Sequence, residues 1–230
     1  LSIVSKIIVG LTDQYQNIEA IGIAGQMHGI LYVDNSGEPV SPLYTWQDGR
    51  GNLPFDADLT YAEYISKKTG YNVSTGFGLV THFYNNHNNL ITKSASKLCT
   101  IMDFVAMNLA GVSIPVTDHT NAASLGLFDL EKFEFDIERI QKLGMNKDIL
   151  PEVIDAGKVI GNYSDDIKVC NALGDNQASF LGSVREIRES ILVNIGTSSQ
   201  VSVYTDQYEY IKDVDLRPFP GGGYIMVGSG

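Results

Sequence analysis

The most informative stretch of the sequence is residues 172–179, which read Ala-Leu-Gly-Asp-Asn-Gln-Ala-Ser. A carboxylate such as Asp175, on a glycine turn before an Ala/Ser-rich helix, can accept a proton from a hydroxyl group. A second stretch, residues 193–199, reads Val-Asn-Ile-Gly-Thr-Ser-Ser and predicts an apolar strand that enters a tight turn. Backbone N–H groups and hydroxyls at such a turn suit phosphate oxygens. The two stretches together predict a site that phosphorylates a small polyol.

Four more blocks of the chain also point to a sugar kinase. They are Gly-Gln-Met-His-Gly at 25–29, Thr-Trp-Gln-Asp-Gly-Arg at 45–50, Ser-Thr-Gly-Phe-Gly at 74–78 and Asp-His-Thr-Asn-Ala-Ala-Ser-Leu-Gly at 118–126. In this order, and with residues 174–178, they resemble the FGGY family of carbohydrate kinases. The tryptophan block is similar to that of sedoheptulokinases, whereas xylulokinases more often have Trp-Asn-Asp. Five blocks in the right order leave little room for chance.

This resemblance implies the fold and its division into domains. We expect an α/β chain with the actin-like ATPase (ribonuclease H-like) fold of sugar kinases. Residues 1–184 are expected to form the sugar-binding domain I, and residues 185–230 to begin the nucleotide-binding domain II. The charged run at residues 185–189 marks the change between the two.

Both ends of the chain predict a piece of a longer kinase. Members of the family open with an Asp-x-Gly-Thr-Thr hairpin, which has no counterpart near Leu1, and their adenosine-binding Gly-Gly segment is expected beyond Gly230. We therefore expect domain I to lack its first hairpin, domain II to be truncated and the isolated chain to be inactive. A sheet edge left unpaired favours association, so a homo-oligomer is a further expectation.

The resemblance also implies roles for individual residues. Asp175 is the expected catalytic base and the expected contact of the Mg²⁺ that accompanies ATP. The expected sugar-binding residues are Gln26, Met27, His28, Trp46, Asp48 and Asn176. The expected residues for the nucleotide phosphates are Gly196, Thr197 and Ser198. The expected ligands are ATP and a small sugar, sedoheptulose first, with xylulose or another pentulose or polyol as alternatives.

Most of these residues also have a purely structural interpretation. Asp175 alone would more often cap a helix, and a single tryptophan such as Trp46 more often belongs to a core. Met27 suits a pocket and a core equally, and Arg50 could serve to hold Asp48 in place. Two other functions stay open: a sugar-binding module without catalysis, and a glycoside hydrolase with Asp48 and Asp175 as its carboxylate pair. Hydrolysis gives the Gly-Thr-Ser-Ser turn no role.

Composition argues against several classes of partner. The chain has 230 residues, of which 43% are hydrophobic, and a formal net charge of −11, so it can bury a core but repels nucleic acid and anionic membranes. No apolar run approaches the ~18 residues that span a bilayer. Cys99 and Cys170 stand outside any CxxC or Cys/His pattern, which is typical of a reducing compartment. The sequence predicts a cytoplasmic protein.

Apolar residues recur at spacings that alternate between helix and strand. Helices are expected over residues 1–11, 57–68, 82–89, 133–143 and 176–182, and strands over 20–24, 30–33, 190–195, 200–204 and 224–227. Residues 97–109 begin as a strand or a helix, and residues 104–111 favour a helix that stops at glycine. The turn at residues 34–37 predicts a hairpin that returns Trp46 to the sheet edge where the strand 20–24 ends. Pro-Phe-Pro-Gly-Gly-Gly at 218–223 indicates a flexible connection and not a phosphate loop.

Overall fold

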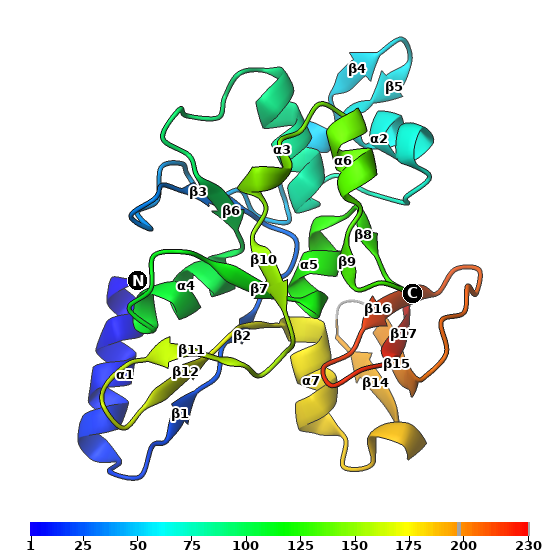
Figure 1. Ribbon diagram of the computed structural model, residues 1–230. Helices are drawn as coiled ribbons and strands as arrows, with labels where there is room; N and C mark the ends of the chain where they lie inside the picture. The colour runs from blue at the N-terminus through cyan, green and yellow to red at the C-terminus, as the bar shows by residue number, and fades with distance from the viewer. Residues whose placement is uncertain (197–198, 230) are drawn as a thin grey trace.

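The computed structural model describes residues 1–196 and 199–229 (Figure 1). The helices are α1 Ser2–Gln14, α2 Tyr61–Thr69, α3 Gly78–His87, α4 Ile101–Leu109, α5 His119–Leu125, α6 Ile137–Lys142 and α7 Asp175–Ser183, with short 3₁₀ turns η1 Gly49–Asn52, η2 Lys147–Ile149 and η3 Ile187–Glu189. In these described ranges, none of the helices is both long and apolar enough to cross a membrane.

The strands are mostly short. They are β1 Ala20–Ile21, β2 Ala24–Gly25, β3 Leu31–Val33, β4 Pro54–Asp56, β5 Leu59–Thr60, β6 Lys97–Cys99, β7 Val116–Asp118, β8 Phe128–Asp129, β9 Glu134–Phe135, β10 Glu152–Ile154, β11 Val159–Asn162, β12 Lys168–Cys170, β13 Leu173–Gly174, β14 Ile191–Ile195, β15 Ser199–Thr205, β16 Asp215–Pro218 and β17 Tyr224–Ser229.

Two parallel strands, each with a break, position the turns that follow Gly25 and Gly174. β1 runs beside β12 and β2 beside β13, so residues 20–25 follow residues 168–174 in the same direction. Gly25 lies directly opposite Gly174. Parallel strands end at a common edge of the sheet, which is where open α/β folds bind ligands. The chain therefore leaves both strands side by side, at the two glycine-containing turns that the sequence singled out.

Helix α1 is covered along one stripe only. Val4 and Ile8 pack with Val169 in a cluster beside α4, whereas Ile3 and Ile7 expose 73% and 58% of their surface. The predicted first helix is confirmed. Its apolar residues form two stripes, and only one of them packs against the described part of the chain.

The largest hydrophobic core lies in the upper half of Figure 1, between α2, α3 and α5. Ile65, Leu79 and Leu125 contribute to it from these three helices and are almost completely buried. Helix α2 begins with a capping box, in which Thr60 Oγ1 accepts the Glu63 N–H and the Glu63 carboxylate accepts the Thr60 N–H. Such a box satisfies N–H groups that the first turn of a helix leaves unpaired.

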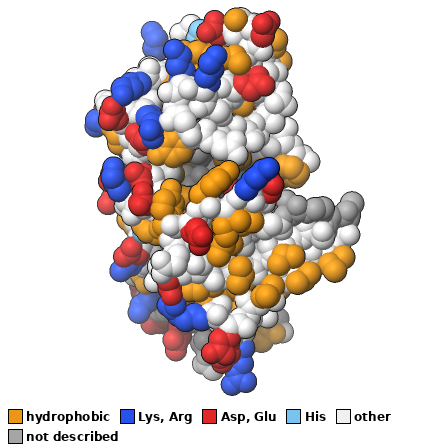
Figure 2. Space-filling view, turned by 90° about the vertical axis from the view of Figure 1, so that its right-hand side faces the viewer, with side chains coloured by type: hydrophobic (Ala, Val, Ile, Leu, Met, Phe, Trp, Pro, Cys, Tyr) orange, Lys and Arg blue, Asp and Glu red, His pale blue; other side chains and the backbone are white. Residues whose placement is uncertain are grey.

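The C-terminal part forms an antiparallel sheet in the order β14-β15-β17-β16. One face packs on α7, where Phe180 and Phe219 share a buried cluster. On the other face, Ile191, Val193 and Ile195 alternate along β14 and are exposed. Figure 2, which looks on to this side, shows a row of hydrophobic side chains along the projecting part of the molecule. Among described residues this face is uncovered along β14, whereas at β17 Tyr224 is buried and stacks on Phe133 with ring centroids 5.6 Å apart.

Two predicted helices begin later than their apolar pattern indicates. Residues 57–68 open with the hairpin of β4 and β5, where Ala57 adopts a left-handed φ of 51°, and the helix starts at Tyr61. Residues 133–143 open with β9, and the helix starts at Ile137. In each case a capping side chain, Thr60 or Asp136, sets the start. Hydrophobic periodicity alone does not show this boundary.

Residues 97–109, whose start was open between strand and helix, contain both: β6 and α4 divide at Thr100, whose hydroxyl caps the helix. Two further elements differ from the prediction. Helix α3 starts at Gly78, ahead of the predicted residue 82. Strand β16 was not predicted, because its Asp, Arg and Pro residues do not read as a strand. The strands expected at 190–195, 200–204 and 224–227 are present as β14, β15 and β17.

Candidate active site

A cleft of about 680 Å³ opens where the chain leaves Gly25 and Gly174. The 26–28 turn, Trp46, the start of α7 and the C-terminal sheet all line it. The structure thus brings together most of the residues expected to bind sugar or to catalyse its phosphorylation, namely Gln26, Met27, His28, Trp46, Asp175 and Asn176.

His28 has a left-handed backbone, with φ at 77°, which is uncommon for a residue with a side chain. Its N–H donates to Ser124 Oγ (3.1 Å), its Nδ1 lies 2.6 Å from the Ser124 carbonyl oxygen, and its ring stacks on Phe77 with centroids 4.6 Å apart. A carbonyl only accepts, so Nδ1 carries the proton and Nε2 of the neutral ring is an acceptor. Burial lowers the pKa of His28, and the charge of Arg217 also lowers it. The ring is therefore neutral near pH 7.

Asp175 is the first residue of α7, and its side chain is exposed to the cleft. The Gly174 N–H before it donates to Thr120 Oγ1 (2.9 Å). A Cβ on Gly174 would lie 2.9 Å from both Met27 Sδ and Gln177 Oε1, so a larger residue here would displace these two side chains. Asn176 Oδ1 is buried and has no hydrogen-bond partner in the described chain. The start of α7 thus offers the cleft the Asp175 carboxylate, and the unpartnered Asn176 amide oxygen is buried at the same helix start.

Trp46 brings an indole ring that is 54% exposed to the same cleft. The predicted hairpin carries it there, with Ile30 bridged to Tyr44 as the chain returns. Gly76 supports the segment from behind: its φ is 86°, and a Cβ would come within 2.0 Å of the Trp46 carbonyl oxygen. The block at residues 74–78 therefore acts as a backing for Trp46, and its Phe77 ring supports His28.

The structure does not bring Asp48 into the cleft, although the sequence predicted a sugar contact there. Its Oδ1 accepts the Arg50 N–H (3.0 Å) and Nε–H (2.7 Å) and so caps η1. Arg50 in turn reaches Asn85 and lies over the Tyr44 ring at 4.3 Å. Of the described residues that line the cleft, only Asp175 carries a carboxylate. The carboxylate pair that a glycoside hydrolase requires is not assembled.

The structure describes only one of the three residues expected to bind the nucleotide phosphates. Gly196 lines the cleft at the end of β14, whereas Thr197 and Ser198 lie outside the described residues. Asn194 and Gln200, which were not expected, line the cleft from the same sheet. The sequence could have indicated both residues, because side chains alternate between the two faces of a strand and those two positions apart share a face.

Arg217 is the most significant residue that sequence reasoning missed. It stands on β16, lines the cleft and is about three-quarters buried. Its Nη2 donates to Asp215 Oδ2 at 2.9 Å. No local pattern indicated it, because β16 is an edge strand that ends at Pro218, and proline is normally a strand breaker.

Helix α5 explains the block at residues 118–126. Thr120 holds Gly174, Ser124 holds His28, and Asn121 Nδ2 donates to the Ala172 carbonyl (3.2 Å). All three side chains are buried, and buried polar groups need partners. One short helix thus supports both glycine turns, and its buried polar residues were the sequence signal for this role.

The donor groups of the cleft suit Mg²⁺ better than a transition metal. Within residues 1–196 and 199–229, no cluster of three or more His, Cys, Asp or Glu could hold a metal. Mg²⁺ usually needs only one or two carboxylates, because water and substrate phosphates complete its shell. Asp175 offers such a carboxylate, and the Asn176 amide oxygen lies next to it in the chain.

Known proteins resemble this chain over most of its length. Residues 2–182 match the model of the FGGY family of carbohydrate kinases, N-terminal domain. The chain belongs to the FGGY family. This FGGY chain is 33% identical over 213 residues to the sedoheptulokinase of Mus musculus, covering 83% of the chain and 44% of the relative. It is 26% identical to the xylulose kinase of Staphylococcus xylosus, covering 92% and 47%. The chain spans about half the length of these curated relatives, or slightly less.

Solved structures of FGGY kinases share its fold. The xylulose kinase of Brucella ovis has a TM-score of 0.80 at 20% identity, and the alignment covers 98% of this chain and 48% of that one. The glycerol kinase of Plasmodium falciparum, solved with ADP, has a TM-score of 0.78 at 22% identity, with 97% and 49% covered. The α/β sugar-kinase fold expected from the sequence is confirmed.

Proposed function

We propose that this chain supplies the sugar-binding side of a kinase that transfers the γ-phosphoryl group of ATP to a primary hydroxyl of a keto-sugar. One observation carries the proposal. Asp175 faces a cleft whose other lining residues, His28, Asn176 and Trp46, offer two hydrogen-bond acceptors and an exposed aromatic ring. These are the groups that a polyhydroxyl substrate needs.

The chemistry follows from these positions. Asp175 accepts the proton of the attacking hydroxyl, which raises the nucleophilicity of the oxygen. His28 Nε2 and Asn176 Oδ1 accept hydrogen bonds from other hydroxyls of the sugar, and the Trp46 ring packs on its C–H face. Phosphoryl transfer depends mainly on alignment and charge neutralisation. The closely held turns at Gly25 and Gly174 supply this alignment on the sugar side.

The nucleotide contacts form the opposite side of the same cleft. Gly196 lies at the turn after β14, and we place the β- and γ-phosphates near it, with Thr197 and Ser198 as further contacts. Mg²⁺ supplies charge neutralisation when bound, and Asp175 would hold it. One protein carboxylate is enough for this, because water and the substrate phosphates supply most of the Mg²⁺ ligands.

Sedoheptulose is the first candidate substrate, and xylulose or another pentulose or polyol is the alternative. The identity to sedoheptulokinases is higher than the identity to the xylulose kinase, which supports this order. A sugar-binding protein without kinase activity is the second candidate function. It is favoured by one observation, that buried hydrogen bonds from α5 hold the two turns of His28 and Gly174, which a protein that only binds sugar would also need.

Three further expectations are kept as proposals. The division at residues 184 and 185 is supported by the family match, which ends at residue 182, although Phe180 also packs with the C-terminal sheet. A cytoplasmic location is supported by the unpaired thiols of Cys99 and Cys170. Self-association is supported by the exposed apolar residues of α1 and β14.

Two measurements test the function. Calorimetric titration of sedoheptulose, xylulose and glycerol into the chain should show sugar binding that weakens in Trp46→Ala and in His28→Ala, since truncation leaves polar groups unpaired. A coupled assay of ADP formation with the whole protein should show turnover that depends on the sugar. Unchanged affinity in both variants would move the sugar site elsewhere, and sugar binding without ADP formation would establish the non-catalytic alternative.

A further inference from the structure

A second cavity continues from the cleft beyond His28. Its volume is about 300 Å³, which is at the lower end of the range for small-molecule pockets. Met27, His28 and Arg217 line both spaces, whereas Asp175 and Asn176 line the cleft alone. The two spaces therefore adjoin at Met27, His28 and Arg217, so a molecule with one end at Asp175 would extend past these residues toward the cavity.

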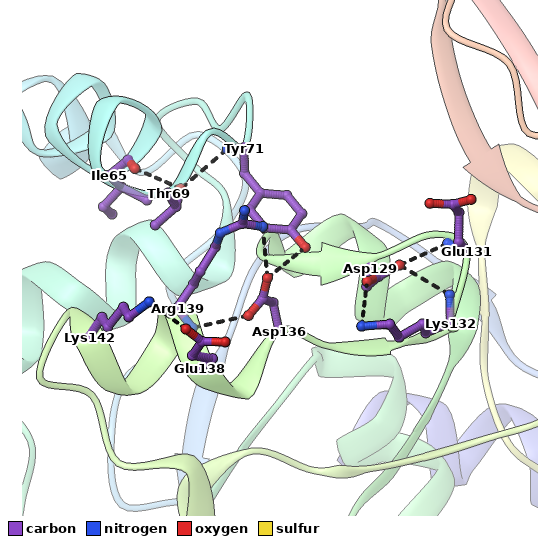
Figure 3. Close-up of polar contacts among 10 residues, drawn as sticks. All are labelled: Ile65, Thr69, Tyr71, Asp129, Glu131, Lys132, Asp136, Glu138, Arg139 and Lys142. Atoms are coloured by element: carbon purple, nitrogen blue, oxygen red, sulfur yellow. Dashed lines mark hydrogen bonds and ion pairs between the residues drawn. The ribbon is translucent and has the colours of Figure 1, made fainter.

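One wall of the cavity is held in place by polar contacts on its outer side. Tyr71 lines it, and the Tyr71 hydroxyl donates to Asp136 Oδ2 at 3.2 Å. Arg139 donates to the same carboxylate oxygen at 2.8 Å, and its guanidinium lies 5.1 Å from the centre of the Tyr71 ring. Figure 3 shows these three side chains converging. Phe77, stacked on His28, forms another part of the wall. A preformed wall lowers the entropic cost of binding.

Arg217 is the charged group at the entrance. Its Nε and Nη2 both donate to Asp215 Oδ2, at 3.1 and 2.9 Å, whereas its Nη1 makes no hydrogen bond with the described part of the chain. The strand that carries it is tied to α7, because Gln177 Nε2 donates to the Pro218 carbonyl at 3.0 Å. Arg217 is thus held in place relative to Asp175, with one N–H edge available to a ligand.

The charges of the cavity favour a neutral polyhydroxyl ligand over an acidic one. Glu209 and Asp215 line it together with Arg217, so the carboxylates outnumber the guanidinium. A second anion there would be repelled. Hydroxyl groups match this mixture, because they accept from Arg217 Nη1 and donate to carboxylates or to His28 Nε2.

We infer that this cavity binds the far end of an extended, neutral keto-sugar, and that Arg217 makes the site selective for chain length. The inference rests on the proposed function and narrows it to ketoses long enough to pass His28. A three-carbon polyol positioned at Asp175 stays within the cleft and does not reach the cavity.

Kinetics of the whole protein with sugars of different length test this inference. In Arg217→Met, kcat/KM for a seven-carbon ketose should fall about 10- to 100-fold, the value of a hydrogen bond to a charged group. The loss should appear in KM and should be clearly smaller for glycerol, which stays in the cleft and makes no contact within the cavity. Val214→Trp, which fills the cavity from a loop residue, should also lower kcat/KM more for the seven-carbon ketose than for glycerol. Arg188→Met, at an exposed ion pair outside the cavity, is the matched control.

Several results would overturn the inference. An equal loss for all sugars in Arg217→Met would mean that the residue acts on the phosphoryl group. No loss in both cavity variants, or preferential use of a sugar acid, would mean that the far end of the sugar lies elsewhere. If the wild-type protein phosphorylates no sugar, the proposed function fails, and calorimetry with the same sugars and variants still decides whether the cavity binds the longer ketose. Absence of that binding overturns the inference as well.

Discussion

The wall of the cleft that carries His28 and Asp175 is fixed by buried hydrogen bonds, whereas the wall that carries Asn194 and Gln200 belongs to a sheet that is uncovered on one face along β14. On the first wall, α5 supplies Thr120, Asn121 and Ser124 as partners of the two turns. On the second, Ile195 is 82% exposed. The difference indicates that the wall with His28 and Asp175 is preorganised within this chain, while the sheet wall depends on packing against α7 and on the contacts of Tyr224.

The largest expected effect concerns the chemistry at the fixed wall. Asp175→Asn should lower kcat of the whole protein by about 10²–10⁴, the usual contribution of a general base, while sugar affinity stays within a small factor. Steady-state kinetics and calorimetry measure the two quantities, with the exposed Asp166→Asn as control. A variant that keeps more than about a tenth of the wild-type kcat would remove Asp175 from the chemistry.

The second effect concerns the attachment of the sheet wall. Phe180 is fully buried on α7 and meets the Phe219 ring edge-on with centroids 5.8 Å apart. Phe180→Ala should lower the free energy of unfolding by about 3–5 kcal/mol, because it leaves a cavity between helix and sheet. Urea denaturation measures this loss, and Phe180→Leu should cost clearly less. A loss below about 1 kcal/mol for the alanine variant would show that the sheet is held by other contacts.

The third effect is a pH dependence of stability that arises from His82, a buried residue of α3. Burial of His82 lowers its pKa to about 4, and the unfolded value is near 6.5. The unfolded chain therefore binds more protons between these values, so the stabilising contribution of neutral His82 is complete above pH 6.5 and lost as the pH falls towards 4. Relative to His82→Asn, the wild type should lose about 3 kcal/mol across this window.

Denaturation of both proteins at several pH values between 4 and 7 measures the difference. The exposed His87→Asn controls for the substitution itself. A constant difference between wild type and His82→Asn over this range would contradict burial of the neutral imidazole.

The smallest effect concerns the support of His28. Ser124→Ala removes the acceptor of the His28 N–H, so we expect a loss of about 1 kcal/mol in stability and a weaker affinity for sugar without a change in kcat. NMR of the His28 imidazole should report the altered position, which a general loss of stability would not produce. Ser183→Ala, at an exposed serine of α7, is the control. An unchanged His28 spectrum and unchanged KM would show that Phe77 and the Ser124 carbonyl suffice.

The position of the cleft could be predicted because it follows from local sequence. A short apolar strand that ends in a glycine turn occurs at residues 20–25 and again before Asp175, and parallel strands place such ends at one edge. The hairpin at residues 34–37 returned Trp46 to the same edge for an equally local reason. By contrast, β16 and Arg217 were missed, because an edge strand that ends in proline has no apolar alternation to reveal it.

Asp48 is a residue for which the local sequence suggested a role that the structure does not show. Its block suggested a sugar contact, but the short spacing to Arg50 allows a cap and an ion pair, and the structure has both. Motif resemblance indicates that a residue is near a site. It does not show whether the side chain faces the ligand or holds the turn.

The sequence by itself determined the turns and the family, because each of these depends on residues a few positions apart. Only the tertiary structure decided that Ser124 holds His28, 96 residues away, and that Thr120 holds Gly174, 54 residues away. It also decided that Arg217 stands at the entrance of a second cavity. These pairings depend on how elements pack, and a hydrogen bond between distant segments leaves no periodic trace in the sequence.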